Sequence, residues 1–460
     1  MSSPTHPAAS IPDRSLFRKE GFLIALLGIS VILVIMNTMM FNFALTDVAK
    51  EYGLSAVATS WIVTGYSIIF AISSITYSRL SDFVPIHRLL VIGSLSLSLA
   101  AIVGYFVDSY VMLLAVRFVQ ASGAGAIPAL ALVICSRYVP LERRGKAMAT
   151  IMSAAALGLG IGPVAGGAIV EYLGWHELFL VTAVTFVLVP FFLATVPREK
   201  PARGSFDALG ALLAGAGTTG LLMFLTNHSW IALIGGVAAI LLFIIRIRKA
   251  AQPFVLPALF ANKPYLSLSA VGIAAYLCSF STLYLMPQLL VKQYGLSAIE
   301  AGLVIFPGSL LSMLVSSRVG RMIDRKGNLP IIRYVPLIVL LSVVLFALFD
   351  GAGYAAISVI YILLSIGFTF ITSSVSNEMS RILPPKQIGS GLGLQQLLQF
   401  FSGAFGVAMS ATAVGWQKDF KLSHAYSNIY WGLAVIVALS LLCVVHYLRS
   451  RSRAVQSLAA

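Results

Sequence analysis

An arginine stands inside an otherwise uncharged stretch that is long enough to cross a lipid bilayer. The stretch covers residues 109–136, and Arg117 is followed within one helical turn by Gln120. A charge at membrane depth is costly, and such residues usually mark a transport pathway or a buried polar network. The alternative is a structural cation that hydrogen-bonds backbone carbonyls at a helix break. We expect Arg117 and Gln120 to act in coupling or conformational exchange.

Small residues recur in the next uncharged stretch, residues 147–170. Gly158, Gly162 and Gly166 are spaced by four positions, and Pro163 follows the second of them. Residues four apart lie on one face of a helix, and glycines let two membrane helices approach closely. We therefore expect this face to pack tightly on another helix, with the proline adding bend. Contact with a ligand is the alternative interpretation.

The composition indicates that these stretches lie in a membrane. Of the 460 residues, 59% are hydrophobic and only 10% are charged, whereas soluble domains carry about a quarter charged residues. The net charge is +15, but the basic residues fall in short clusters between apolar runs, which argues against nucleic-acid binding. The three cysteines and six histidines show no metal or disulfide spacing, and no phosphate-binding Walker motif is present. We predict neither an enzyme nor a metal site.

Uncharged stretches near or above the roughly 17–25 residues that span a bilayer occur fourteen times. They predict an all-α integral membrane protein with fourteen transmembrane helices. The stretches are 21–46, 52–78, 89–107, 109–136, 147–170, 178–197, 208–227, 229–245, 264–291, 301–317, 334–349, 351–377, 387–417 and 425–445.

Lysine and arginine are distributed unevenly between alternate loops of this topology. One side collects most of the basic residues, and the other has only Lys50, Lys292, Lys418 and Lys421. Basic loops tend to stay in the cytoplasm, so both termini are predicted to be cytoplasmic. An odd number of spans would scramble this bias.

Two loops on the basic side resemble each other. One reads SRLSDFVPIHR and the other GRMIDRKGN, with an aspartate in an equivalent place just after an apolar span. Internal repeats are how many transporters build two halves around a central site. We expect these loops to act as gates, and solvated loop charges are the alternative. The candidate gate residues are Asp82, Arg88, Gly320, Asp324 and Arg325.

The repeat also divides the chain. Its two copies lie too far apart for six spans alone, so two extra spans are expected between the halves, with Asp207 capping the first of them. The predicted division is a cytoplasmic tail at 1–20, a six-helix half at 21–197, a linker and inserted helix pair at 198–250, a second six-helix half at 251–447, and a cytoplasmic tail at 448–460.

Uncharged polar and aromatic residues inside the spans are candidates for a substrate cavity. Any one of them is more often an interhelical hydrogen bond than a ligand contact. As a set they suit a large amphipathic substrate. The candidates are Asn37, Asn42, Trp61, Tyr66, Tyr284, Gln288, Gln395 and Gln396.

Several of these motifs match one family. Gly320, Asp324, Arg325 and Gly327 match a Gly-x-x-x-Asp-Arg-x-Gly loop signature, and Arg117 with Gln120 matches an Arg-x-x-Gln-Gly-x-Gly helix signature in which Ala121 replaces a glycine. With the glycines around Pro163, they make the chain resemble the major facilitator superfamily over roughly residues 20–447. Within its fourteen-helix drug-exporter branch, the chain is most similar to Gram-positive tetracycline efflux proteins.

The resemblance implies a function and a setting. It implies two six-helix halves that move about a central cavity in the bacterial plasma membrane, a monomeric assembly and no cofactor. An amphipathic small molecule would be exported, with the proton gradient as the energy source. The lipid bilayer and this substrate are then the expected partners.

The sequence departs from that pattern where proton coupling needs acids. Thr38 and Leu159 stand where the tetracycline proteins have acidic residues, and all sixteen Asp and Glu residues fall in loops or near span ends. A buried carboxylate is the usual proton carrier, because burial moves its pKa toward neutrality. Glu378, which precedes Arg381, is the nearest approach to one, and we expect it in a solvated helix-end pair.

Three hypotheses stay open. The first is a secondary exporter of amphipathic compounds that works by alternating access. The second is a lipid or metabolite exporter, or a uniporter, that uses no carboxylate at the membrane midplane. The third is a membrane sensor that does not transport.

Overall fold

The computed structural model describes residues 15–54, 56–199, 201, 206–227, 229–251, 253–349, 353–417 and 419–459. In this part of the chain the regular structure is helical. The helices are α1 (Ser15–Tyr52), α2 (Ala56–Leu80), α3 (Ile86–Gly104), α4 (Tyr110–Ala124), α5 (Ala126–Tyr138), α6 (Leu141–Tyr172), α7 (Leu178–Ala183), α8 (Thr185–Thr195), α9 (Ala208–Asn227), α10 (Trp230–Lys249), α11 (Pro257–Ala261), α12 (Lys263–Tyr294), α13 (Ala298–Lys326), α14 (Leu329–Phe349), α15 (Tyr354–Ile382), the 3-10 turn η1 (Pro385–Gln387), α16 (Ile388–Trp416) and α17 (Leu422–Ala459).

Fourteen segments of this part of the chain are long and apolar enough to cross a membrane, which confirms the predicted number of transmembrane helices. Two of the fourteen are divided, into α4 with α5 and α7 with α8. The first division has a visible cause at Gly125. A Cβ there would lie 2.5 Å from the Phe70 carbonyl oxygen, and the Ser74 hydroxyl donates to the Gly125 carbonyl at 3.0 Å. The close approach of α2 therefore marks the break.

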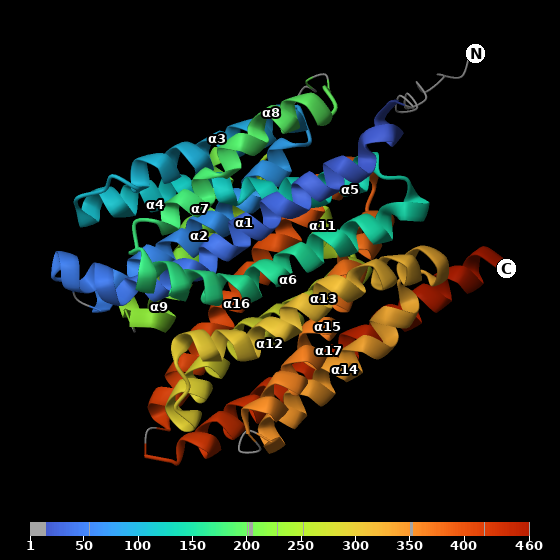
Figure 1. Cartoon of the computed structure of the whole chain (residues 1–460). Helices are drawn as coiled ribbons and strands as arrows, with labels where there is room; N and C mark the ends of the chain where they lie inside the picture. Colours follow the sequence, from blue (N-terminus) through green and yellow to red (C-terminus); the bar gives the residue numbers. More distant parts are fainter. Residues whose placement is uncertain are drawn as a thin grey trace, which may run out of the picture.

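The helices form one elongated bundle in which α6 holds a central place (Figure 1). One face of α6 packs on α1 and the other on α13, and α2 packs on α16. The α6–α13 and α2–α16 pairs join α1–α8 to α12–α17. Within the latter group, α12 packs on α16 and α17, and α14 packs on α15 and α17. The two groups thus meet along two lines of contact, α6 with α13 and α2 with α16, which we call the seams.

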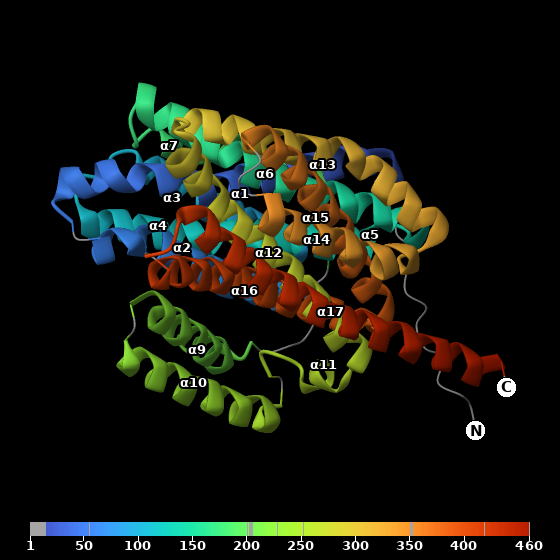
Figure 2. The same ribbon diagram turned by 90° about the horizontal axis from the view of Figure 1, so that it is seen from below.

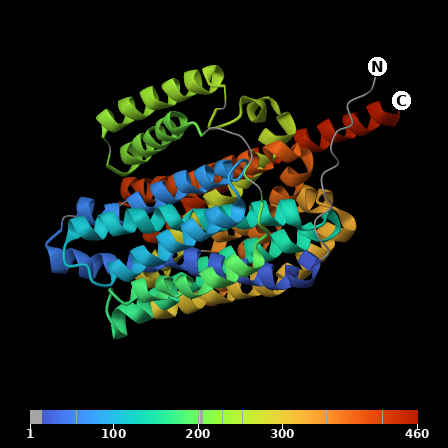
Figure 3. The same cartoon turned by 90° about the horizontal axis from the view of Figure 1, so that it is seen from above.

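Helices α9 and α10 pack on each other at the edge of the bundle, and α9 touches α2 and α16 (Figures 2 and 3). Asp207 holds this pair in place. Its carboxylate accepts from the backbone N–H of Gly210 at 3.0 Å, from Arg246 Nε at 3.1 Å and from the N–H of Phe254 at 3.3 Å. The first of these bonds confirms that Asp207 caps α9, and the other two tie α10 and the following loop to it.

Candidate functional site

Arg117 lies on α4 and is completely buried. Its Nη1 donates to Gln120 Oε1 at 2.7 Å, and Gln120 Nε2 donates to the hydroxyl of Thr182 at 2.9 Å. The guanidinium carbon lies 3.9 Å from the centre of the Phe41 ring and 4.0 Å from that of Tyr66. Two aromatic faces thus flank the cation, and such contacts stabilise a desolvated charge by about 2 kcal/mol or more.

The polar groups around Arg117 are only partly satisfied. Asn37 Nδ2 donates to the Tyr66 hydroxyl at 3.1 Å, but Asn37 Oδ1 and the Nε and Nη2 atoms of Arg117 have no hydrogen-bond partner. None of the ion pairs among the described residues includes Arg117. A buried guanidinium without a carboxylate is costly, so the aromatic rings and Gln120 carry its stabilisation here. We call Asn37, Phe41, Tyr66, Arg117 and Gln120 the arginine cluster.

Thr38 and Leu159, the two positions at which the resemblance to tetracycline efflux proteins implies acids, contribute no charge. The Thr38 hydroxyl donates to the Val34 carbonyl of its own helix at 3.1 Å, and its side chain is buried. Leu159 is packed in the hydrophobic core. Neither residue offers a carboxylate to the arginine cluster.

The glycines of α6 form two tight faces. A Cβ at Gly158 would lie 2.8 Å from the Ile32 carbonyl oxygen of α1, and Cβ atoms at Gly162 and Gly166 would lie 2.7 and 2.8 Å from Met39 and Met40. Such distances are too short for any side chain, so backbone contact between α1 and α6 requires glycine. On the opposite face, Gly160 approaches Ser309 of α13.

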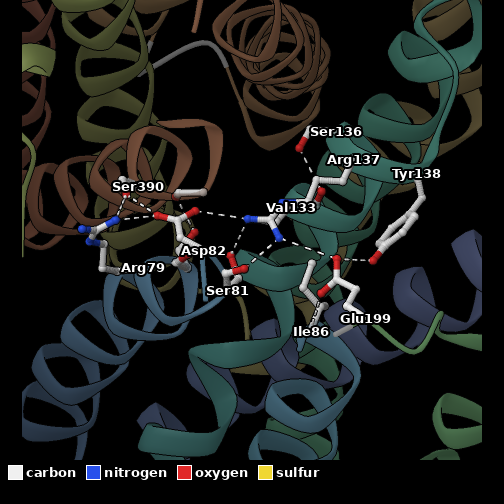
Figure 4. A network of polar contacts seen from close by, with 12 residues as sticks. Arg79, Ser81, Asp82, Ile86, Val133, Ser136, Arg137, Tyr138, Glu199 and Ser390 are labelled. Carbon is white, nitrogen blue, oxygen red and sulfur yellow. Dashed lines mark hydrogen bonds and ion pairs between the residues drawn. The ribbon is translucent and has the colours of Figure 1, made fainter. Parts of the chain in front are cut away.

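Asp82 joins the two groups of helices through side chains (Figure 4). It forms ion pairs with Arg79 at 2.7 Å and with Arg137 at 3.1 Å, and it accepts a hydrogen bond from the Ser390 hydroxyl at 2.6 Å. Ser390 begins α16, whereas the three charged residues belong to α2, α5 and the turn between α2 and α3. We call these four residues the Asp82 network.

The same turn is held from two further directions. The Ser78 hydroxyl donates to the Gly389 carbonyl of α16 at 2.8 Å, and Arg137 Nη1 donates to the Ser81 carbonyl at 2.7 Å. Glu199 accepts from the backbone N–H of Ile86 at 3.0 Å and from the Tyr138 hydroxyl, and it lies 3.7 Å from Arg137 (Figure 4). The carboxylate of the linker thus completes the network.

Asp324 makes the corresponding connection in the other direction, from α13 to α6. Its Oδ1 accepts from the backbone N–H of Gly145 at 2.9 Å, and its Oδ2 accepts from that of Lys146 at 3.2 Å. The helices touch so closely that a Cβ at Gly320 would lie 2.3 Å from Lys146 Cα. We call Gly145, Lys146, Gly320 and Asp324 the Asp324 contact.

Burial acts on the Asp324 carboxyl more strongly than its hydrogen bonds do. Desolvation raises the pKa of Asp324 above the ordinary value of an aspartate, and the two backbone N–H groups and the nearby basic residues offset this only in part. Ion pairs with Asp324 are absent from those found among the described residues. Its charge is therefore less well compensated than that of Asp82.

Aromatic rings fill the space between the two groups of helices. Phe70 of α2 meets Phe400 of α16 with 4.7 Å between ring centres, and Phe400 continues to Tyr276 of α12 at 5.6 Å. Tyr66 of the arginine cluster lies 6.3 Å from Phe70, and Phe368 of α15 lies 5.0 Å from Tyr276. An aromatic row thus runs from the arginine cluster across the seam between α2 and α16.

Uncharged polar side chains lie buried close to this row. Gln395 and Gln396 of α16 are almost fully buried, and both polar atoms of the Gln395 amide and the oxygen of Gln396 lack hydrogen-bond partners. Gln399, one turn further, has an unpartnered Nε2. Buried amides without partners cost about 1–3 kcal/mol each. These groups are available to a polar ligand or to water once the interior opens.

Four expected site residues lie away from these clusters. Asn42 is exposed, because it faces outward on α1. Trp61 lines a groove of about 500 Å³ between α2 and α9, beside the inserted pair. Arg88 is exposed at the start of α3, and Arg79 and Arg137 contact Asp82 in its place. Arg325 is exposed in the last turn of α13.

Pro163 and Gln288 meet although they come from different halves of the sequence. They line a small cavity of about 230 Å³ with Pro287 and Lys292. Gln288 donates to the Tyr284 carbonyl at 3.2 Å, and Tyr284 is half-buried. This cavity is smaller than the roughly 300–1,000 Å³ of sites for drug-sized ligands.

Glu378 differs from the expected solvated helix-end pair. Its side chain is only 2% exposed, and it accepts hydrogen bonds from Asn328 and Tyr447 and pairs with Arg451 of α17. Arg381 is exposed instead. A buried carboxylate needs such partners, and α17 supplies two of them.

Sequence reasoning missed the partners of the predicted residues. Phe41 and Thr182 of the arginine surroundings, and Ser390 where α16 meets α2, come from segments without a charged motif. Gly145 lies between Arg144 and Lys146, and it contacts Asp324 through its backbone N–H, which no side-chain motif indicates. Arg137 carried a signal, since it is the first charge after an uncharged span.

Comparison with known proteins agrees with this architecture. The family model of the Major Facilitator Superfamily matches residues 27–407. The human organic anion transporter MFSD10 (TETRAN) has a similar fold, with a TM-score of 0.68 at 14% identity, covering 91% of this chain and 99% of that one.

Relatives with stated roles are similar over most of their length. The chain is 24% identical over 457 residues to the riboflavin transporter RibZ of Clostridioides difficile (strain 630), covering 95% of this chain and 100% of that protein. It is 28% identical to the cephamycin export protein CmcT of Amycolatopsis lactamdurans, with 88% of each covered. It is 27% identical to the lincomycin resistance protein LmrB of Bacillus subtilis (strain 168), with 82% of each covered. The chain therefore belongs to the major facilitator superfamily and is a membrane transporter, not an enzyme.

Proposed function

We propose that this transporter is a secondary active exporter of amphipathic small molecules, tetracycline-like antibiotics among them, and that it works by alternating access in a bacterial plasma membrane with both termini in the cytoplasm. The observation that carries this proposal is the interior between α2 and α16. Aromatic rings and unpartnered glutamines are packed together there, with the arginine cluster beside them, and they would face a cavity if the two helices separated. Apolar pockets with a few polar groups suit amphipathic ligands.

The contacts at one end of the bundle support the alternating-access part of the proposal. The Asp82 network and the Asp324 contact both connect α1–α8 to α12–α17. Both consist of a few polar bonds at helix ends, which can be broken and re-formed when one half rocks against the other. The relatives named for cephamycin export and lincomycin resistance agree with the direction of transport that we propose.

Efflux from cells that express the full chain tests the proposal. Tetracycline, a cationic dye and a quaternary ammonium compound are loaded, and their loss is compared with that from cells expressing Arg117→Gln. We expect the wild type to export at least one of them and Arg117→Gln to export none, because the buried guanidinium orders Gln120 and Tyr66. Arg88→Gln, which removes an exposed arginine, is the matched control and keeps transport. Absence of transport of all three by correctly inserted wild type would contradict multidrug export.

The missing acids favour a second candidate. Thr38 and Leu159 leave the arginine cluster without a proton carrier, which suits a lipid or metabolite exporter, or a uniporter. Proteoliposomes with and without a pH gradient separate the two functions. Proton antiport predicts transport that stops when the gradient is removed, whereas the second candidate predicts transport down the substrate gradient at either setting.

A further inference from the structure

A large groove lies on the outer surface of the bundle between α14 and α17, which run side by side (Figure 1). Its volume is about 830 Å³, far larger than the cavity at Pro163. The walls are mainly aliphatic, and one end carries three arginines. The lining residues are Leu329, Arg333, Tyr334, Leu337, Leu441, Val444, Val445, Leu448, Arg449 and Arg451.

The arginines give this end of the groove a surplus of positive charge. Arg451 is balanced by Glu378. Arg333 and Arg449 are exposed, and neither takes part in an ion pair found among the described residues. Arg333 lies four residues into α14, about 6 Å along the helix axis. Arg449 lies two residues before the end of the membrane-spanning segment Leu422–Arg451, and α17 continues beyond it. Both guanidiniums therefore lie near the ends of membrane-spanning segments, at the depth of lipid headgroups.

The aliphatic walls continue from the arginines toward the middle of the membrane. Leu337 lies one turn beyond Arg333 on α14, and Val445 and Leu441 lie one and two turns before Arg449 on α17. Their side chains are partly or largely exposed in the absence of lipid. A basic end and an apolar trough about 12 Å long match a molecule with an anionic head and a hydrocarbon tail.

We propose that this groove binds an anionic phospholipid, with its phosphate on Arg333 and Arg449 and one acyl chain on Leu337, Leu441 and Val445. Guanidinium groups bind phosphate oxygens in a bidentate manner. A free phosphate would leave the aliphatic walls without a partner. A second copy of the chain, docked through the same face, would bring like charges together at the arginines. The site is separate from the arginine cluster and does not depend on the proposed export function.

Binding of a phosphatidylglycerol with a fluorescent acyl chain to the purified full-length protein in neutral detergent micelles tests the proposal. The double variant Arg333→Gln/Arg449→Gln removes the two guanidiniums that lack an ion pair, and Arg451 stays intact because it pairs with Glu378. We expect saturable binding by the wild type and roughly thirtyfold weaker binding by the variant, since each basic residue near a membrane surface contributes about 1 kcal/mol, a factor of about five. The control Arg248→Gln/Lys249→Gln removes two exposed charges at the end of α10 and binds as the wild type does.

A second variant tests the apolar wall with the charges in place. Leu337→Trp fills the trough, whereas Leu241→Trp adds the same ring at an exposed position of α10. We expect only Leu337→Trp to weaken phosphatidylglycerol binding, by tenfold or more.

Four outcomes would overturn the proposal. They are equal affinity for phosphatidylcholine, unchanged binding by the Arg333/Arg449 variant, displacement of the lipid by an equal concentration of glycerol phosphate, and a dimer formed through this face that excludes the lipid. The first two would remove the anion site, the third would make it a site for soluble anions, and the fourth would make it an interface.

Discussion

The Asp82 network and the Asp324 contact join the same two groups of helices with different chemistry. Asp82 is held by two arginines and a serine hydroxyl, all of them side chains. Asp324 is held by two backbone N–H groups of α6 and by no ion pair among those of the described residues. Two loops that resemble each other in sequence thus both connect the two groups of helices, one through side chains and the other through backbone groups.

The difference follows from which residues the repeat has kept. The second loop keeps Gly320, and its lack of a side chain lets α13 approach Lys146 until backbone groups reach Asp324. In the first loop Ser78 replaces the glycine, and the equivalent approach is made from the partner side by Gly389, where a Cβ would lie 2.5 Å from Asp82 Oδ1. The side-chain bonds of the Asp82 network can be removed one at a time by substitution. The backbone bonds of the Asp324 contact can be broken only by changing Asp324 or by preventing the close approach of α13 and α6.

The largest effect is expected from Gly320→Val. Its Cβ would lie 2.3 Å from a backbone atom of α6, so the Asp324 contact cannot close and transport falls to background. Spin labels at Arg88 and Lys326, two exposed positions on the two sides, report the separation by the distance between them. The control is Gly235→Val, where nothing lies within 4 Å. A closed distance and normal transport in Gly320→Val would show that backbone approach is dispensable.

Asp82→Asn is expected to come next. It leaves Arg79 and Arg137 without their counter-charge in a setting where the Asp82 side chain is only 10% exposed. Loss of such a partner costs about 2–3 kcal/mol. Both ion pairs lie within α1–α8, so only the part of this cost that weakens the bonds of Asp82 and Arg79 to Ser390 of α16 shifts the equilibrium between closed and open forms, by at most roughly 30- to 150-fold. The same pair of spin labels measures the shift, and Asp108→Asn, at an exposed aspartate, is the control. Unchanged distances would mean that the charge of Asp82 does not help to hold its turn against Ser390 of α16.

Ser390→Ala removes two hydrogen bonds, the one that the hydroxyl donates to Asp82 and the one that it accepts from Arg79 Nη1 at 3.1 Å, and leaves both ion pairs. The bond to the Asp82 carboxylate contributes about 1.5 kcal/mol, and Arg79 keeps its ion pair with Asp82, so the closed form is expected to lose stability by roughly tenfold. Ser440→Ala, whose hydroxyl bonds only within α17, is the control for loss of a buried hydroxyl. An effect as large as that of Asp82→Asn would place the serine, not the arginines, at the centre of the network.

Much of the fold was predictable because each helix that crosses a bilayer must be a continuous apolar run in the sequence. An uncharged run of about twenty residues has one stable form in lipid, a helix, and the fourteen runs became fourteen candidate spans. The α6 glycines were predictable as a packing face for the same reason, since their spacing of four is a property of one helix. The identity of the helix that they pack on, α1, was not predictable, because the sequence of one helix does not specify which other helix it contacts.

Site residues were predictable only where they belong to a sequence motif themselves, and not where they are partners brought in by the fold. Asp82 and Asp324 stand out by position. Arg88, a candidate gate residue of the same loop as Asp82, is exposed, and the two arginines that contact Asp82 are Arg79 and Arg137. Glu378 shows the same limit. Its partners Asn328 and Arg451 lie 50 and 73 residues away along the chain, so nothing local indicates that it is buried.

The smallest effect, and the sharpest test of the comparison, is expected from Asp324→Asn. Burial raises the pKa of Asp324, so the closed contact favours the protonated carboxyl relative to water. The closed form therefore gains stability as pH falls toward the ordinary range of an aspartate, and loses it as pH rises through the raised pKa. The amide that Asp324→Asn introduces cannot ionise, and its single oxygen keeps the bond from Gly145 while the longer bond from Lys146 is lost. The amide also avoids the cost of burying a charge, so we expect this variant to stay within a few-fold of the wild type but to lose that pH dependence in the Arg88–Lys326 distances. A variant that keeps the pH dependence would assign it to another group, and the two aspartates would then differ in geometry alone.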